Sequence, residues 1–363
     1  MAKKTTIYAI IVVAIVVIAA VIVVFLPKND QGKTIYWIQI APKDQATQLA
    51  LGNIDGAISW EPFCSDSILA GTAHAVKWSD EIWSGHPCCV MAVKTTYLEA
   101  NSDLIARMVR AHIDASNWIN DAIAHPDDAN YTLLLQMGSD FSARNTSVVE
   151  AALEHITFDY QLTTNVKNWL GNFTEMFADL GQLTSIGSYP NVSAFVDDFV
   201  NTSVITQAMA VEPSDTVINP SQPLRLGYLA GDLHQLARAV AMNTTVFGGK
   251  TLYEAYGVNV VSANPAGYAN GPAVMTAFAG NAIDVGYLGA PPAILNRLNA
   301  NTDIQVLALA NTEGSAILGI TGINTFADFD GKVIATPGPG SIQHLLLLDY
   351  AKLNGFNVKL KGT

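Results

Sequence analysis

The stretch Thr336-Pro337-Gly338-Pro339-Gly340-Ser341-Ile342-Gln343-His344 decides the fold that we expect for this chain. It follows a short apolar run at 333–335 that predicts a strand, and it precedes 345–353, where leucines recur at helical spacing. The two glycines let the backbone turn sharply, the two prolines keep the loop out of a helix, and Ser341 is a natural N-cap. Backbone N–H groups and the positive end of the helix dipole then meet at one spot, which suits an anion. The alternative reading is an ordinary turn between a strand and a helix.

Length, charge and cysteine usage narrow the class of protein. The chain has 363 residues, enough for two domains, and a formal net charge of -12 with no basic stripe, which argues against a nucleic-acid partner. The loop at 336–344 matches neither the P-loop motif nor the dinucleotide-binding fingerprint. The three cysteines form no Cys-x-x-Cys pair and no Cys/His cluster at zinc spacing. We therefore expect neither a cofactor nor a metal.

The start of the chain predicts a membrane anchor. Residues 7–26 are an unbroken apolar run long enough to cross a bilayer, and Lys3 and Lys4 place the preceding end in the cytoplasm. We expect a cytoplasmic stub at 1–6, a single-pass anchor at 7–26 in the cell membrane, a linker at 27–33 and an extracytoplasmic remainder. A cleavable signal peptide is the alternative, but the end of the run offers no small-x-small cleavage site.

An extracytoplasmic location leaves two chemical questions open. An oxidising exterior would allow Cys64 to pair with Cys88 or Cys89, and buried free cysteines are the alternative. Six Asn-x-Ser/Thr triplets are compatible with glycosylation. They begin at Asn130, Asn145, Asn172, Asn191, Asn201 and Asn243.

The pattern of apolar runs predicts an α/β protein. Residues 212–223 hold three prolines without apolar periodicity and predict a linker. After it, strand-like runs alternate with helices, the signature of α/β layers with mostly parallel strands. The strands predicted over the whole chain are 35–40, 54–60, 88–93, 224–229, 258–261, 283–288, 304–308, 316–320 and 333–335.

Small and polar residues collect just past these strands, where ligands of such folds bind. None of them forms a Ser/His/Asp or Cys/His arrangement with spacing that argues for nucleophilic catalysis, so we expect a binding site and not an enzyme. The candidates at strand ends are Trp60, Glu61, Gly231, Asp232, His234, Asn270, Gly271, Gly289, Glu313, Gly340, Ser341, Ile342 and Gln343.

Most of the chain after the anchor resembles a known family, the substrate-binding proteins of ABC importers for nitrate, sulfonate, taurine and bicarbonate. Residues 224–358 resemble the family's amino-terminal half, and residues from 38 to about 200 resemble its carboxyl-terminal half. The motifs that carry the resemblance are Leu226-Gly227-Tyr228, Ala269-Asn270-Gly271-Pro272, the block 283–292, the loop 336–344, Gly52-Asn53-Ile54-Asp55-Gly56 and Ser59-Trp60-Glu61-Pro62-Phe63. The halves stand in exchanged order, which indicates a circular permutation or a gene-model artefact.

The resemblance implies a two-lobed, type II periplasmic-binding-protein-like clamshell. One lobe would hold 95–320, and the other 34–90 with 328–363; the chain would cross between them near 90–94 and near 320–326. The partners would be a small solute and the permease and ATPase subunits of an ABC importer. A ligand-sensing domain and an enzyme similar to thiamine-pyrimidine synthases are alternative functions.

The resemblance also implies roles for residues at the cleft. Ser341, Ile342 and Gln343 would offer helix-start donors to an oxyanion, with Asn270 and Gly271 doing so from the other lobe. Tyr228, Tyr287 and Trp60 would wall the cleft, and the alternative for each of them is a place in the core. His234 and His344 would lie beside the cleft, and the alternative for each of them is a surface role. If two of the carboxylates Asp232, Glu313 and Glu61 face the cleft, a zwitterion such as taurine would suit it better than nitrate or bicarbonate.

Overall fold

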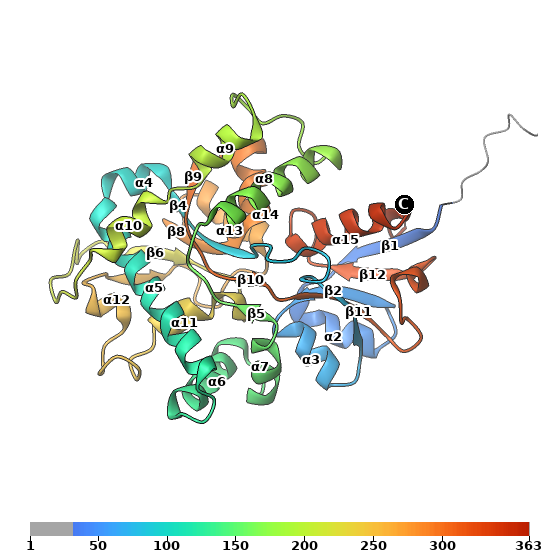
Figure 1. Cartoon of the computed structure of the whole chain (residues 1–363), viewed down its shortest axis with the longest axis horizontal. Helices are drawn as coiled ribbons and strands as arrows, with labels where there is room; N and C mark the ends of the chain where they lie inside the picture. The colour runs from blue at the N-terminus through green and yellow to red at the C-terminus, as the bar shows by residue number, and fades with distance from the viewer. Residues whose placement is uncertain (1–31, 363) are drawn as a thin grey trace, which may run out of the picture.

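Two β-sheets organise the molecule, one in each of two lobes (Figure 1). The computed structural model describes residues 32–362. The predicted anchor at 7–26, the stub at 1–6 and most of the 27–33 linker therefore lie outside the described residues. Among the residues that are described, no helix is long and apolar enough to cross a membrane.

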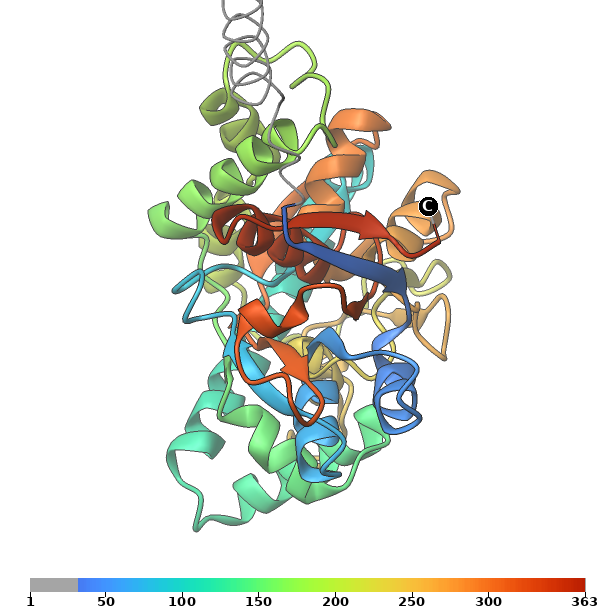
Figure 2. The same cartoon turned by 90° about the vertical axis from the view of Figure 1, so that its right-hand side faces the viewer.

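The first sheet has six strands and brings the two ends of the described chain together. Its first four strands run parallel, and β11 pairs antiparallel with both β2 and β3. Helix α15 covers one face and helices α2 and α3 the other (Figures 1 and 2). In spatial order the strands are β13 (Asn357–Leu360), β1 (Thr34–Gln39), β12 (Val333–Thr336), β2 (Gly56–Trp60), β11 (Ser315–Gly319) and β3 (His74–Trp78).

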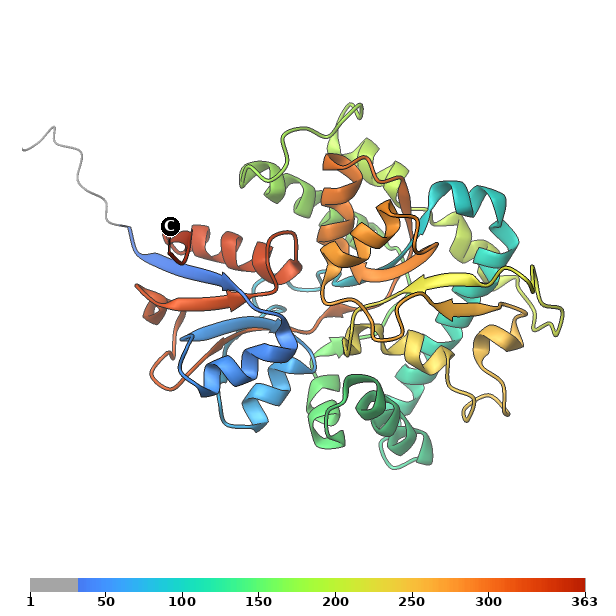
Figure 3. The same ribbon diagram turned by 180° about the vertical axis from the view of Figure 1, so that it is seen from behind.

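The second sheet has five strands and lies in the other lobe, which Figure 3 shows from behind. Strands β7, β6 and β8 are parallel, whereas β4 is antiparallel to β8 and β9. Strand β4 is fully buried over 89–93, as a central strand should be. The order is β7 (Val260–Ser262), β6 (Leu224–Gly227), β8 (Val285–Gly289), β4 (Cys89–Lys94) and β9 (Ile304–Leu309).

Helices surround the two sheets. The helices of the first lobe are α2 (Pro42–Ala50), α3 (Phe63–Leu69) and α15 (Ile342–Leu353), with the 3-10 turn η2 (Phe326–Phe329). The others are α4 (Thr95–Ala100), α5 (Ser102–Ala124), α6 (Ala129–Ser142), α7 (Thr146–Leu153), α8 (Thr164–Asp179), α9 (Val192–Phe199), α10 (Ser203–Met209), η1 (Leu233–Gln235), α11 (Leu236–Ala241), α12 (Leu252–Ala255), α13 (Gly271–Ala279) and α14 (Ala290–Asn299). A short ribbon of β5 (Ile156–Thr157) and β10 (Thr312–Glu313) lies apart from both sheets.

The chain passes between the sheets earlier than we expected at both points. Strand β11 pairs with β2 in the register Ser315↔Trp60 to Gly319↔Gly56, so it belongs to the six-stranded sheet. Strand β4 already lies in the five-stranded sheet. The crossings are therefore residues 79–88 and 310–314, and those expected near 90–94 and 320–326 are wrong. The apolar runs were found correctly, but their pairing depends on contacts remote in sequence.

Residues 211–223 contain no helix or strand and join α10 to β6, with one isolated bridge from Ile218 to Val258. This segment is the one predicted as a linker at 212–223. It leads directly into β6, which pairs in parallel with β8.

Candidate functional site

A small buried cavity lies where the two lobes meet. It has a volume of about 20 Å³, which is enough for one or two water-sized guests. The lobe of the six-stranded sheet contributes Trp60, Ser341, Ile342 and Gln343. The remaining lining residues are Cys88, Cys89, Leu229, Asp232, His234, Gly271, Gly289 and Pro292.

The loop between β12 and α15 brings a helix start to this cavity. Ser341 caps the helix, since its Oγ accepts from the His344 amide at 3.1 Å and donates to the Gly338 carbonyl at 2.8 Å. Gly338 has φ 112°, and a Cβ there would lie 2.5 Å from Gln39 Nε2, so the turn requires glycine. The amide ends and positive dipole of α15 therefore point to the side of the cavity formed by 341–343.

A second helix start reaches the cavity from the opposite lobe. Asn270 caps α13, where its Oδ1 accepts from the Ala273 amide at 3.0 Å. Gly271 follows and lines the cavity; a Cβ there would lie 2.4 Å from Pro292 Cγ. The starts of α13 and α15 thus approach one small space from two lobes, and both favour negative charge. None of the described residues that line the space is Lys or Arg.

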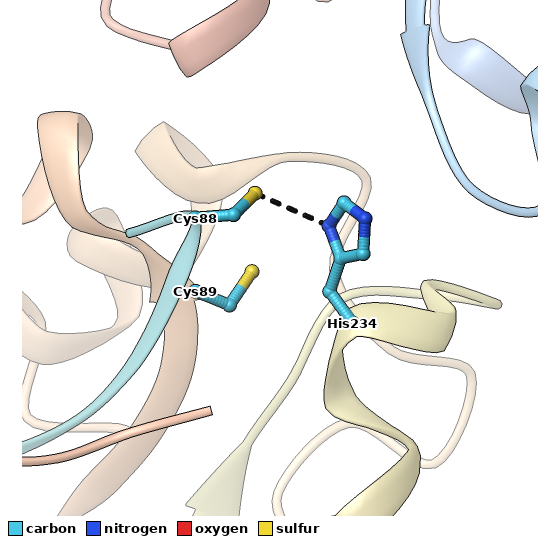
Figure 4. A group of neighbouring side chains, drawn as sticks. All are labelled: Cys88, Cys89 and His234. Atoms are coloured by element: carbon cyan, nitrogen blue, oxygen red, sulfur yellow. Dashed lines mark hydrogen bonds between the residues drawn. The ribbon is translucent and has the colours of Figure 1, made fainter. Parts of the chain in front are cut away.

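Two thiols and an imidazole face each other in the same cavity (Figure 4). Cys88 Sγ lies 3.2 Å from His234 Nδ1, and the ligand atoms of Cys88, Cys89 and His234 all lie within 4.8 Å of one another. The cysteines are 2% exposed and the histidine 1%. All three cysteines of the chain are free and buried, so the open alternative of a disulfide from Cys64 is not what the structure shows.

Asn311 fixes the backbone that carries the two thiols. Its carbonyl accepts from the Cys88 amide at 3.0 Å, and its side-chain Oδ1 accepts from the Cys89 amide at 3.0 Å. Side chains of consecutive residues in a regular strand point to opposite faces. Because β4 begins only at Cys89, this clamp allows both sulfurs to face His234.

The electrostatics of the cluster favour a charge-separated pair. Burial by itself would raise the pKa of the Cys88 thiol, but bonding from Cys89 and the nearby His234 hold that pKa well below its ordinary value. Burial would lower the pKa of His234, but the neighbouring Cys88 and Asp232 raise it to about 9. Burial raises the pKa of Cys89 well above its ordinary value. The surroundings of Cys88 therefore favour its deprotonated form more than those of Cys89 do.

Asp232 is a buried neighbour of the cluster, with its Oδ1 3.4 Å from His234 Nδ1. It is 1% exposed, and burial raises its pKa to about 6 despite His234, which lowers it. Its Oδ1 accepts from the His234 amide at 3.0 Å, and its Oδ2 accepts from Gln235 Nε2 at 3.1 Å. Cys89 Sγ lies 3.6 Å from the same Oδ2. Asp232 therefore orients the turn that carries His234.

Trp60 contributes a hydrogen-bond donor that is not used within the protein. The side chain is 4% exposed and lines the cavity, and its indole Nε1 has no partner among the described residues. A buried N–H without a partner costs free energy, which an acceptor atom in the cavity would recover.

Several expected site residues lie elsewhere. Glu61 is fully buried and accepts from the Ser65 amide at 3.0 Å and hydroxyl at 2.7 Å, and Glu313 accepts from the Gly85 amide at 2.7 Å. Only Asp232 of the three carboxylates lines the cavity, so the condition that favoured a zwitterion is not met.

The two tyrosines expected to wall the cleft are packing residues. Tyr287 is fully buried and bonded to His112, and Tyr228 donates to the Pro265 carbonyl with Arg238 3.7 Å above its ring. His344 is buried against Trp37 and does not line the cavity. The remaining expected residues outside the lining are Gly231, Asn270 and Gly340.

Sequence reasoning missed the two cysteines that line the cavity. No local motif joins them to His234, because the histidine follows a different strand 145 residues after Cys89. The available signal was weak: two adjacent cysteines begin one predicted strand, and a histidine follows the end of another. Leu229 and Pro292 were also missed as lining residues.

Part of the chain is similar to one protein family and to one known protein. Residues 27–133 match the NMT1-like family. The nitrate import ATP-binding protein NrtC of Synechocystis sp. is 23% identical over 107 residues, which are 30% of this chain and 16% of that protein. No solved structure matches the chain. The segment 27–133, which carries Trp60, Cys88 and Cys89 of the cavity, is therefore similar to the NMT1-like family.

Proposed function

We propose that this chain is an extracytoplasmic solute-binding protein of an ABC importer that encloses a small anion of the nitrate or sulfonate class. One observation carries the proposal: the starts of α13 and α15 approach a single buried cavity from two lobes. Helix starts of this kind bind anions through backbone amides. The match to the NMT1-like family and the similarity to a nitrate import protein support a role in transport.

The unpartnered Trp60 indole adds to this argument. An anion in the cavity would accept from Nε1, and a hydrogen bond to a charged group contributes about 1.5–3 kcal/mol. The cavity of about 20 Å³ holds one or two water-sized guests, so the lobes would open to admit the solute and would close less tightly around it, by a hinge motion like that of other binding proteins. The solute would then pass to a permease driven by an ATPase, with the chain held at the membrane through 7–26. The exchanged order of the two halves remains part of the proposal as a circular permutation.

Ligand-dependent thermal stability tests this function. The full chain is melted with nitrate, bicarbonate, taurine and alkanesulfonates, and the anion that binds should raise Tm in a concentration-dependent way. Trp60→Phe keeps an aromatic side chain and removes the donor, so it should weaken binding about 10- to 100-fold. Trp118→Phe, on the half-buried side of α5, is the matched control and should bind as the wild type does. The absence of any shift with all four solutes would refute the proposal.

A second candidate rests on the Cys88–His234 contact. A thiolate beside an imidazole is a common arrangement for a nucleophile, and it favours an enzyme of the thiamine-pyrimidine-synthase-like class. In that case Cys88 should react with iodoacetamide much faster than Cys64. Equal rates of alkylation by iodoacetamide at Cys88 and Cys64 would argue against an enzyme.

A further inference from the structure

The two thiols and the imidazole have no role in simple anion capture. Backbone amides at the two helix starts would hold an anion without the sulfurs, and the buried carboxyl group of Asp232 in the same lining opposes an anion. The proposed function therefore leaves the most chemically reactive group of side chains in the cavity unexplained.

We propose that Cys88, Cys89 and His234 bind one soft divalent metal ion of the Zn²⁺ type through two sulfurs and Nδ1. Thiolates and imidazole select this class of ion over Mg²⁺ or Ca²⁺. Two thiolates would neutralise the charge of a divalent ion, so the low-dielectric interior would not have to bury an uncompensated charge. The metal site depends on the proposed function only in its last step, in which an anionic solute occupies the remaining coordination position.

The distances between the three ligand atoms are compatible with such an ion after small movements. Zn–S bonds of about 2.3 Å and Zn–N bonds of about 2.0–2.1 Å at tetrahedral angles place sulfurs about 3.8 Å apart and sulfur and nitrogen about 3.6 Å apart. The observed Cys88 Sγ to His234 Nδ1 distance is 3.2 Å, and no pair exceeds 4.8 Å. Changes of about 1 Å or less would complete the geometry.

The imidazole is held in the orientation that a metal ligand requires. His234 Nε2 lies 3.0 Å from the Gly314 carbonyl, which can only accept, so Nε2 carries a proton. Nδ1 therefore directs its lone pair to the cysteines whenever the ring is neutral. A ligating histidine typically donates its other N–H to a carbonyl or carboxylate in this way.

The protein supplies three ligands and leaves space for a fourth. The cavity of about 20 Å³ is bounded on the far side by Ser341, Ile342 and Gln343 at the start of α15. Sites with three protein ligands keep an open position for water or substrate. An anionic donor there would contact the metal on one side and the amide end of α15 on the other.

Cobalt binding tests the metal site without a solute. The full chain is reduced, stripped with a chelator and titrated with Co²⁺, a spectroscopic substitute for Zn²⁺. We expect one equivalent to produce the near-ultraviolet thiolate-to-cobalt charge-transfer band and the visible bands of tetrahedral Co²⁺. Zn²⁺ should abolish these bands and raise Tm. A folded wild-type chain that shows no charge-transfer band would overturn the proposal.

Variants assign the bands to this site. Each of three variants should weaken Co²⁺ binding by more than about 100-fold: Cys88→Ser, Cys89→Ser and His234→Gln. This loss exceeds the roughly 10- to 100-fold loss that is typical when a residue bonded to a metal ligand is replaced. Gly314→Ala acts indirectly: its Cβ would lie 2.3 Å from His234 Nε2, so we expect a 10- to 100-fold loss. Cys64→Ala is the control, because Cys64 is a buried thiol outside the cavity. Equal losses in the control would refute the assignment, and circular dichroism checks that each variant is folded.

The outcome is separable from that of the proposed function. If an anion stabilises the metal-free chain while Co²⁺ gives no bands, the metal site is wrong and anion capture stands. If Co²⁺ binds but no anion changes Tm with or without metal, the metal site stands and anion capture is wrong.

Discussion

Replacing His112 by Gln should make the stability of the protein less sensitive to acid. His112 is fully buried on α5, where its Nε2 donates to the Leu309 carbonyl at 2.8 Å and its Nδ1 accepts from the Tyr287 hydroxyl at 3.1 Å. Burial lowers the pKa of His112 from 6.5 to about 4, although the bond to Leu309 acts in the opposite direction. The folded protein therefore keeps this ring neutral at pH values where the unfolded chain protonates it.

The sign and size of the effect follow from that difference. Below pH 6.5 the unfolded chain binds more protons at this position than the folded chain does, so the free energy of unfolding falls as pH falls. A difference between 6.5 and about 4 corresponds in full to about 3 kcal/mol. Linkage over the range from pH 7.5 to pH 5 gives a loss of about 2 kcal/mol from this one group.

Urea unfolding measured at half-unit steps from pH 7.5 to pH 5 provides the test. His112→Gln should be about 1–2 kcal/mol less stable at pH 7.5 because it loses a buried bond, and it should approach the wild type by pH 5. His125→Gln is the control, because His125 is exposed at the end of α5, and its curve should run parallel to the wild type. Equal slopes for the wild type and His112→Gln would refute the reasoning.

Two further substitutions test the packing of the five-stranded lobe by the free energy of unfolding in urea. In the wild type, the Arg225 guanidinium donates to the buried Asp284 carboxylate at 2.5 and 3.0 Å. Arg225→Leu removes this partner and leaves the carboxylate with the backbone amide of residue 225 at 2.9 Å, so we expect a loss of about 3 kcal/mol. Adding Asp284→Leu should recover most of it, and a double variant as unstable as the single one would contradict this account. Phe199→Ala removes a fully buried ring that stacks on Phe195 and should cost about 3–5 kcal/mol. Leu353→Ala, at a side chain that is 71% exposed, should cost less than about 0.5 kcal/mol, and similar losses for both would argue against the packing.

Apolar runs in the sequence located most of the strands in the two sheets. The run at 54–60 became β2, whose five residues are all buried, and the run at 283–288 became β8. Strand β3 was missed because its residues are all only half-buried and its sequence, His-Ala-Val-Lys-Trp, has no apolar block. Strand β13, at the edge of its sheet, is mostly exposed and was missed for the same reason.

The site could be predicted only where it depends on the local chain. Glycine, proline and the serine cap specify the start of α15 within nine consecutive residues, and the structure places that start at the cavity. The thiol–imidazole cluster depends on β4, the turn after β6 and the 310–314 crossing, which meet only after the sheets have formed. Proximity in the sequence can also mislead: Glu61 follows Trp60 directly, but its carboxylate accepts from Ser65 and does not line the cavity.

The second crossing between the sheets has a mechanical consequence. Asn311 holds the backbone of both cysteines, and Gly314, three residues later, accepts from the ring of His234. Any rotation of one lobe relative to the other must bend this segment, and the spacing between the sulfurs and the imidazole would change with it. The four residues from Asn311 to Gly314 therefore couple the spacing of the sulfurs and the imidazole to the angle between the lobes.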